Sequence, residues 1–327
     1  MLDVMFYEVF DEEERLLRNY MPYYIKAEYT SDTIQEAAPT ILPARLISIR
    51  TQSVIPIEWA DKLDGILSRS QGYDHLIAYC RNTKSNIPCG YLNDYCSRAV
   101  AEHAVMVMIS LFRKLRLQIE KFRRFDREEI TGRECMGRSA LIIGVGRIGS
   151  TIAEILAAFK MRVLGVDIVK RSNIVKYVSL DEGIKVSDVI FCALPLTKDT
   201  YGMLNYNVLS KVKNGALFIN ISRGEIAPET DLARLLLERK LAGAGLDVFS
   251  AEGSLACYLR SANIGCLPEK FSGITELLGM YNVILTPHNA FNTMEAVDRK
   301  ARESVESIVL FLKEGRFPFF IQSNEII

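Results

Sequence analysis

The chain has 327 residues and a net charge of zero, with 40 basic and 40 acidic side chains. This length suits two domains, because a single hydrophobic core stops growing before it. The balanced charge gives no indication of a nucleic-acid partner or of an anionic membrane surface.

The first residues of the chain, its apolar stretches and its cysteines indicate the cellular compartment. The first ten residues lack the basic region of a signal peptide, and the longest apolar stretch, 104–112, is too short to span a bilayer. Seven cysteines, with no C-x-x-C pair, are typical of free thiols rather than of a disulfide framework or a zinc site. We therefore expect a cytoplasmic protein that has no membrane-spanning segment and no metal site.

The first 96 residues predict an α/β unit in which short strands alternate with helices. The expected strands are 3–7, 23–27, 46–50 and 65–69. The last one runs into Arg69-Ser-Gln-Gly-Tyr-Asp-His75, a glycine turn at the carboxyl end of a strand, where open sheets bind ligands. A plain connecting turn is an equally good interpretation of this segment.

A long helical pattern covers 97–124, apolar on most sides at its start and basic later. Such a helix is buried on several faces. We expect it to leave the first domain and pack against the second. His103 lies within the apolar part, where a hydrogen-bonded core histidine is the favoured interpretation.

A glycine-rich turn follows the apolar run 140–143. Gly144, Gly146 and Gly149 form G-x-G-x-x-G between this predicted strand and a helical pattern over 147–160. Gly144 permits the tight turn, Gly146 lets a pyrophosphate approach the backbone, and Gly149 allows close helix packing. The start of the helix offers N–H groups to the phosphates. A structural turn without a ligand is the less favoured alternative.

A second strand, 162–167, ends in Asp167, where this fingerprint places the carboxylate that binds the adenosine ribose. Because Asp167 would repel a 2′-phosphate, we expect NAD rather than NADP as the cofactor. Lys170 and Arg171 lie close enough to leave use of both open.

Further strands at 188–193, 216–221, 243–248 and 282–286 alternate with helical patterns and predict a doubly wound parallel sheet. A capping box at Asn292-Thr-Met-Glu295 opens a last helix that ends at Gly315 and returns to the first domain. The predicted fold is α/β, with two Rossmann-like or flavodoxin-like domains. The cofactor domain, 98–289, is inserted in a substrate-binding domain made of 1–97 and 290–327, and a cleft is expected where they join.

Three side chains suit hydride transfer at a carbon bearing oxygen, which needs a cation, a proton donor and a group that tunes the donor. Arg223 and His288 each follow a predicted strand, and Glu252 follows another on the same edge. Arg223 can grip a carboxylate. His288 is the predicted acid/base, oriented by Glu252. Asp247 either contacts the nicotinamide amide or stabilises a loop.

These motifs together resemble those of the D-2-hydroxyacid dehydrogenases. The segments that carry the resemblance are Gly72-Tyr-Asp-His75, Ala101-Glu-His-Ala104, Gly144-Val-Gly-Arg-Ile-Gly149, Leu194-Pro-Leu-Thr197, Asn220-Ile-Ser-Arg-Gly224, Gly245-Leu-Asp-Val-Phe249 and Thr286-Pro-His-Asn-Ala-Phe291. The resemblance implies the same catalytic set, a homodimer formed through the cofactor domain, and cofactor contacts from Arg147, Ile148, Asp167, Leu194, Pro195, Thr200, Ile221, Ser222, Arg223 and Asp247. It also implies that backbone around Gln71 and Gly72 meets the substrate carboxylate.

Within this family the chain is most similar to the D-lactate dehydrogenase branch, because of the long segment 253–280 and of Tyr95, which falls where that branch keeps a substrate-facing tyrosine. Phe291 and Asn289 depart from the residues usual beside the histidine and could change which side chain the pocket accepts.

The implied reaction is reversible reduction of a 2-oxo acid by NADH to a D-2-hydroxy acid, with pyruvate to D-lactate as the leading pair. Larger 2-oxo acids, as for a D-2-hydroxyisocaproate dehydrogenase, are the first alternative. A non-catalytic NAD(H) sensor on the same fold is the second, although the chain lacks the disordered tails expected of a regulatory scaffold.

Overall fold

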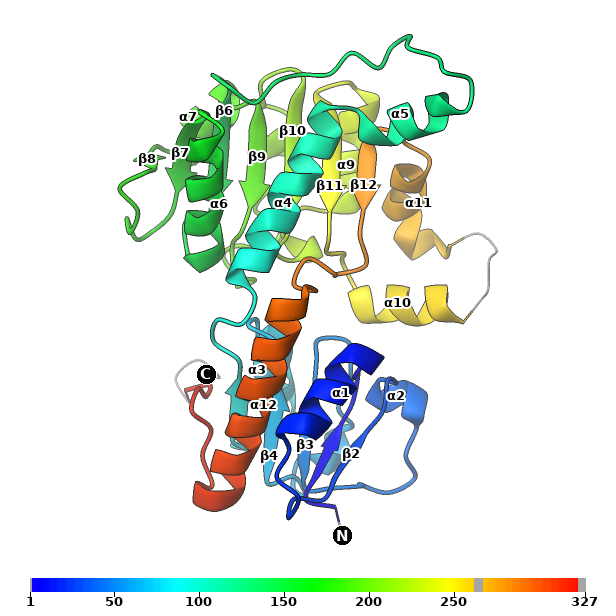
Figure 1. The fold of residues 1–327 in the computed structure, drawn as a ribbon, viewed down its shortest axis with the longest axis vertical. Helices are drawn as coiled ribbons and strands as arrows, with labels where there is room; N and C mark the ends of the chain where they lie inside the picture. The colour runs from blue at the N-terminus through cyan, green and yellow to red at the C-terminus, as the bar shows by residue number, and fades with distance from the viewer. Residues whose placement is uncertain (1, 262–266, 323–327) are drawn as a thin grey trace. The chain divides into compact units, whose positions relative to one another are not determined.

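The computed structural model describes residues 2–261 and 267–322. The chain separates into two compact units, which we call unit 1 (Met1–Cys96 with Asn292–Ile327) and unit 2 (Ser97–Phe291). Both are α/β units, and unit 2 is inserted in unit 1 along the chain (Figure 1). In the part of the chain that the structure describes, no helix is long and apolar enough to cross a membrane.

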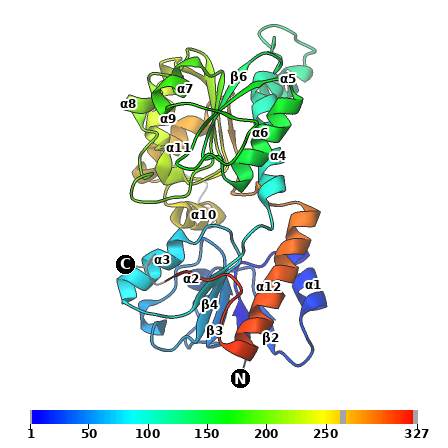
Figure 2. The same ribbon diagram turned by 90° about the vertical axis from the view of Figure 1, so that its left-hand side faces the viewer.

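Unit 1 is built on a five-stranded parallel sheet in the order β2-β1-β3-β4-β5. Its strands are β1 (Val4–Phe6), β2 (Ala27–Tyr29), β3 (Leu46–Ile49), β4 (Gly65–Ser68) and β5 (Cys89–Tyr91). Its helices are α1 (Asp11–Tyr20), α2 (Ile34–Ala37), the 3₁₀ turn η1 (Ile57–Trp59), α3 (Asp74–Thr83) and α12 (Met294–Glu314). Helices α1 and α12 pack together on one face of the sheet and α3 covers the other (Figure 2).

Unit 2 is built on a seven-stranded parallel sheet in the order β12-β11-β10-β9-β6-β7-β8. Its strands are β6 (Ser139–Ile143), β7 (Arg162–Val166), β8 (Lys176–Tyr177), β9 (Val189–Cys192), β10 (Ala216–Asn220), β11 (Leu241–Leu246) and β12 (Val283–Leu285). Helices α4 (Ser97–Phe112) and α6 (Arg147–Ala158) cover one face (Figure 2). The other elements are α5 (Leu115–Phe122), α7 (Leu180–Val186), α8 (Tyr206–Leu209), η2 (Gly224–Ile226), α9 (Glu229–Leu237), α10 (Glu252–Arg260), η3 (Glu269–Phe271) and α11 (Ser272–Leu278).

The central strands of each sheet are buried along their whole length. Every residue of β3, β4, β6, β9 and β10 is buried. Parallel strands covered on both faces have this continuous apolar pattern. Because all strands of a sheet run in the same direction, their carboxyl ends lie along one edge. Open parallel sheets bind their ligands at this edge.

The predicted fold class is confirmed, and three local predictions are wrong. The strand expected at 23–27 begins only at Ala27, because the amide of Ile25 closes a turn on the carbonyl of Pro22 at 3.0 Å. The helix expected over 97–124 breaks where Lys114 takes a φ of 53°, which separates α4 from α5. The last helix is capped by Thr293 rather than by a box that starts at Asn292.

Candidate functional site

The glycine turn of unit 2 has the form that a dinucleotide needs. Gly144 has a φ of 95°, and a Cβ there would lie 2.5 Å from the carbonyl oxygen of Ala193. A Cβ on Gly149 would lie 2.0 Å from the carbonyl oxygen of Gly144, so helix α6 packs directly on the turn. A Cβ on Gly146 would meet nothing within 4 Å. The open space at Gly146, at the N-cap of α6, fits a phosphate group that approaches the backbone.

Asp167 ties the end of β7 to this turn. Its Oδ2 accepts a hydrogen bond from the amide of Val145 at 2.6 Å, and its Oδ1 accepts one from the amide of Val169 at 2.9 Å. The side chain is half-buried. Each carboxylate oxygen can accept a second bond, so Asp167 is held in place and can still receive the ribose hydroxyls of a cofactor.

The loops after β9 and β10 are joined to each other. The hydroxyl of Ser222 donates to the carbonyl oxygen of Leu194, and that of Thr200 donates to the carbonyl of Pro195 at 2.7 Å. Ile221 is also buried here. These contacts bring the predicted cofactor residues of two separate loops to the same edge of the sheet as the glycine turn.

Arg223 lies three positions after the end of β10 and is half-buried. Its Nη1 donates to the carbonyl of Ser222 at 2.8 Å, and its own carbonyl accepts from the side-chain amide of Asn220 at 2.9 Å. The next residue must be glycine, because a Cβ on Gly224 would lie 2.0 Å from the carbonyl carbon of Phe249. This close approach packs the arginine loop against the segment that leads from β11 to Glu252.

Glu252 and His288 are in contact although 36 positions separate them in the chain. Glu252 begins α10 after β11, and His288 follows the neighbouring strand β12 with a φ of 51°. The Oε1 of Glu252 lies 2.7 Å from the Nδ1 of His288, and the two side chains are 18% and 21% exposed. The carboxylate of Glu252 thus bonds Nδ1 of the ring and not Nε2. Arg223, Glu252 and His288 follow three consecutive strands of one sheet edge.

Asp247 holds the loop that carries His288. It is 3% exposed. Its Oδ1 accepts from the Thr286 hydroxyl at 2.6 Å and from the Asn289 amide at 2.8 Å, and its Oδ2 accepts from the Ala290 amide at 2.9 Å. Of the two predicted roles for Asp247, the stabilisation of a loop is the one that these bonds support.

His103 extends this network, as the expected hydrogen-bonded core histidine. Its Nε2 lies 3.1 Å from the hydroxyl of Thr286 and 3.8 Å from the Oδ1 of Asp247. Burial lowers the pKa of His103, and the charge of Asp247 opposes this decrease. The sequence pattern placed His103 in a core but did not link it to the site, because its partners lie more than 140 positions away along the chain.

The predicted substrate residues of unit 1 lie at the carboxyl edge of its own sheet. Gln71 and Gly72 form the turn after β4, where the Ser70 hydroxyl donates to the carbonyl of Gly72 at 2.7 Å. Tyr95 is 4% exposed, and burial raises its pKa well above the ordinary value. Phe291, at the end of unit 2, is 5% exposed.

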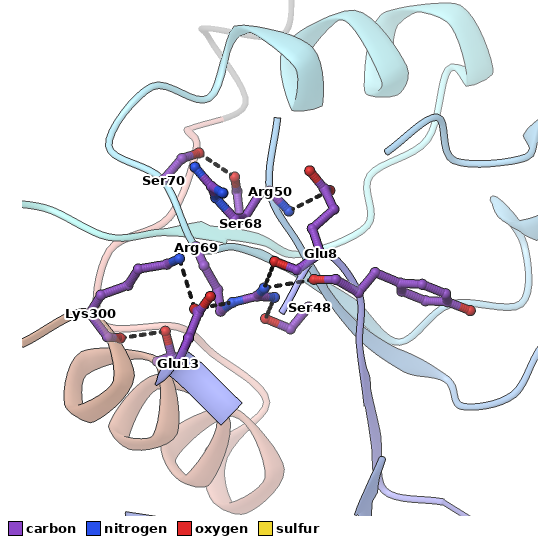
Figure 3. A network of polar contacts seen from close by, with 10 residues as sticks. Glu8, Glu13, Ser48, Arg50, Ser68, Arg69, Ser70 and Lys300 are labelled. Atoms are coloured by element: carbon purple, nitrogen blue, oxygen red, sulfur yellow. Dashed lines mark hydrogen bonds and ion pairs between the residues drawn. The ribbon is translucent and has the colours of Figure 1, made fainter. Parts of the chain in front are cut away.

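The same edge of unit 1 carries a group of charged residues that we did not predict. We call Glu13, Arg50, Arg69 and Lys300 the charged cluster of unit 1 (Figure 3). The side chains of Glu13, Arg69 and Lys300 are fully buried. Charged residues are usually exposed, so the sequence did not lead us to predict a buried cluster of them.

Comparisons with known proteins agree with this geometry. The family described as D-isomer specific 2-hydroxyacid dehydrogenase, NAD binding domain, matches residues 105–290. The chain is 30% identical to a glyoxylate reductase of Pyrococcus furiosus over 98% of this chain and 90% of the relative. It is 29% identical to a D-lactate dehydrogenase of Lactiplantibacillus plantarum over 90% of this chain and 82% of the relative.

Solved structures give the same result. The D-lactate dehydrogenase of Aquifex aeolicus, complexed with NAD and lactic acid, has a TM-score of 0.83 and 30% identity, covering 97% of this chain and 99% of that one. A D-2-hydroxyisocaproate dehydrogenase, at 21% identity and a TM-score of 0.81 over 98% of this chain and 99% of that one, shares the fold. NAD is the cofactor of unit 2. The chain belongs to the NAD-dependent D-isomer specific 2-hydroxyacid dehydrogenases.

Proposed function

We propose that the chain reversibly reduces a 2-oxo acid to a D-2-hydroxy acid with NADH, and that Arg223, Glu252 and His288 carry the reaction. The observation that carries this proposal is the 2.7 Å contact between Glu252 and His288, beside the Arg223 loop and on the sheet edge of the glycine turn. Bound NADH supplies the hydride to the carbonyl carbon.

Arg223 provides the anchor and the electrophile. A guanidinium can hold a carboxylate with two parallel bonds and also attract the negative charge that develops on a carbonyl oxygen. The bond from Asn220 to the carbonyl of Arg223 and the tight approach at Gly224 support this role, because they fix the backbone from which the side chain extends. The bond from Nη1 to the carbonyl of Ser222 orients the guanidinium itself.

His288 provides the proton. The Nε2 proton moves to the developing alkoxide as the hydride arrives, and in the oxidation direction Nε2 removes the same proton. Glu252 accepts a bond from Nδ1 and stabilises the positive imidazolium. Proton transfer of this kind contributes about 10²–10⁴ in rate.

We propose that the cofactor is held by the turns at the carboxyl edge of unit 2. The contributing residues are Gly144, Gly146, Arg147, Ile148, Gly149, Asp167, Leu194, Pro195, Thr200, Ile221, Ser222 and Arg223. The open space at Gly146 and the free acceptor capacity of Asp167 support this assignment. In unit 1 we propose Gln71, Gly72 and Tyr95, and in unit 2 Phe291, as substrate contacts.

Pyruvate and D-lactate are the reference substrate pair, since relatives are named D-lactate dehydrogenase and glyoxylate reductase. The test measures NADH oxidation by the purified protein with a panel of 2-oxo acids and determines the chirality of each product. We expect D products and a preference for NADH over NADPH. If the protein oxidised NADH with none of the 2-oxo acids, the proposed function would be refuted and an NAD(H)-sensing role would be favoured.

We also propose a cytoplasmic homodimer. The exposed apolar side chains of Ile119 (65%), Phe122 (74%) and Phe125 (71%), on and just after α5, support a covered surface on unit 2. Free thiols at Cys80 and Cys89, 3.6 Å apart without a disulfide, are typical of a reducing compartment. Light scattering on the purified protein tests the dimer, and a monomeric mass would contradict it.

A further inference from the structure

Two thiols in the core of unit 1 touch each other, and the proposed reaction uses neither of them. Cys80 is 0% exposed and Cys89 is 2% exposed, and their Sγ atoms lie 3.6 Å apart. This distance is close to van der Waals contact, so no other atom lies between the sulfurs. In the part of the chain that the structure describes, these are the two cysteines whose sulfurs are in contact.

The two thiols come from a helix and from the strand that follows it. Cys80 lies in the last turn of α3, and Cys89 is the first residue of β5, nine positions later. Lys84, with a φ of 54°, ends the helix, and residues 84–88 return the chain to the sheet. The contact between the sulfurs therefore closes a short loop between the helix end and the sheet.

The backbone around Cys89 is held more firmly than the backbone around Cys80. The amide of Ile66 donates to the carbonyl of Pro88, and the amide of Ile321 donates to the carbonyl of Cys89, both at 3.0 Å. The start of β5 is thus bonded on both of its sides. Helix ends fray at a lower free energy than a strand that is bonded on both sides. Cys80 is therefore the thiol that a small solute reaches first, when the last turn of α3 opens.

The hydrogen bond between the thiols gives the two sulfurs different reactivities. The thiolate, and not the thiol, is the nucleophile of a cysteine. The pKa of Cys80 is lowered, because the bond with the thiol of Cys89 stabilises its thiolate by more than burial opposes. The same bond, together with burial, raises the pKa of Cys89. Both accessibility and ionisation therefore favour Cys80 as the thiol that reacts first.

We propose that Cys80 and Cys89 form a redox modification site, at which hydrogen peroxide converts the two thiols into a reversible disulfide. The thiolate of Cys80 attacks one peroxide oxygen, the O–O bond breaks, and hydroxide leaves, so that Cys80 becomes a sulfenic acid. The sulfur of Cys89 then attacks the sulfenic sulfur, the S–S bond forms, and water leaves. In total the two thiols lose two electrons and two protons, and one peroxide is reduced to two waters.

The native arrangement needs only a small movement to accept this bond. A disulfide has an S–S distance of about 2.05 Å, so the sulfurs must approach by about 1.5 Å from their 3.6 Å contact. Rotation of the Cys80 side chain on the frayed end of α3 can supply this approach while β5 stays in the sheet. The inference concerns unit 1 alone and does not depend on the proposed function.

The test maps the bond in the wild-type protein. The reduced, folded protein is treated with hydrogen peroxide, its remaining thiols are blocked with N-ethylmaleimide in denaturant, and it is digested with trypsin. Cleavage after Arg81 and Lys84 places Cys80 in peptide 70–81 and Cys89 in peptide 85–98. We expect these two peptides to be linked, lighter by two hydrogen atoms than their reduced sum, and to separate with dithiothreitol. Fragmentation distinguishes Cys89 from Cys96, which lies in the same peptide. Absence of the Cys80–Cys89 link, with Cys80 blocked or oxidised to a sulfinic acid, would overturn the inference.

Single substitutions test the two roles. In Cys89→Ser, Cys80 should still react with peroxide at a rate within about twofold of the wild type, but it should stop at a sulfenic acid that dimedone traps. In Cys80→Ser, oxidation of Cys89 should be slower by at least about tenfold, because the reactive thiolate is missing. Cys257→Ser is the matched control, since it removes an exposed thiol on α10 and should leave the link unchanged.

Equally fast oxidation of Cys89 in Cys80→Ser and in the wild type would overturn the inference. Circular dichroism checks that each variant is folded. If a serine in this core unfolds a variant, the peptide map of the wild-type protein decides alone.

Discussion

Asp247→Asn tests whether the position of His288 depends on the carboxylate beneath its loop. The two oxygens of Asp247 accept one hydroxyl and two backbone amides from residues 286–290. An asparagine keeps one oxygen and replaces the other by an NH₂ group. That group then faces a donor of the loop, either the amide of Ala290 or the groups of Thr286 and Asn289.

The magnitude follows from these bonds. A hydrogen bond to a charged group contributes about 1.5–3 kcal/mol, and a buried donor without an acceptor costs about 1–3 kcal/mol. One bond is lost and one buried amide is left unpaired in the same event, so we expect the free energy of unfolding to fall by about 2–4 kcal/mol. A displacement of 1 Å in a reacting group costs about 10²-fold in rate. We therefore expect kcat to fall by about 10- to 100-fold.

The assay combines urea unfolding, kcat with a 2-oxo acid, and the Kd of NADH. Asp188→Asn is the matched control, because Asp188 is a buried acid of the same unit that accepts the Ser139 amide at 3.0 Å and pairs with Lys213 at 2.8 Å. It should lose stability and keep kcat. If Asp247→Asn left kcat unchanged and weakened NADH binding tenfold, the carboxylate would act on the cofactor and not on the histidine loop.

Three further predictions concern single residues. His288→Ala should abolish reduction and leave the Kd of NADH within about twofold, measured by fluorescence titration, because the imidazole acts on the substrate; retained turnover would contradict its role. Gly146→Val should weaken NADH binding at least about tenfold with little change in melting temperature, since its side chain would enter open space that we assign to the phosphates. Burial alone would raise the pKa of Glu13, but Lys300, Arg69 and Arg50 outweigh it and lower the pKa from 4.5 to about 2. The ionised Glu13 should therefore add about 3 kcal/mol to the free energy of unfolding above pH 4.5, and this contribution is lost as the pH falls toward 2. Identical acid-unfolding curves for the wild type and Glu13→Gln would refute this.

Much of the fold could be predicted because parallel strands covered on both faces leave a simple pattern. Strand β6 and strand β10 are apolar, wholly buried and followed by glycine turns or helices, and their predicted bounds were nearly right. Strand β8 was missed because it has only two residues, and β5 was missed because Gly90 interrupts its three residues. The break at Lys114 was missed because a single left-handed residue leaves no trace in the apolar spacing.

The contact of Glu252 with His288 could be predicted for a related reason. Both residues follow strands, and the carboxyl ends of parallel strands meet on one edge whatever their distance along the chain. Bonds that depend on side-chain direction could not be predicted. Asp247 and Thr286 join His103 to the histidine loop through hydroxyl and carboxylate groups whose orientation only the packed structure determines.

The buried charges of unit 1 show why a chain retains a costly group near a ligand edge. Moving an ion pair such as Glu13 and Arg69 out of water costs several kcal/mol per ion, and apolar residues often fill such a place equally well. Here, however, Arg69 binds the carbonyls of Tyr7 and Glu8 where β1 ends, and the carboxylate of Glu8 binds three amides where β3 ends. These backbone groups have left the sheet ladder, and buried apolar neighbours would leave them without partners. The charges therefore satisfy backbone groups of the turns after β1 and β3 that apolar side chains of the same volume would leave unpaired.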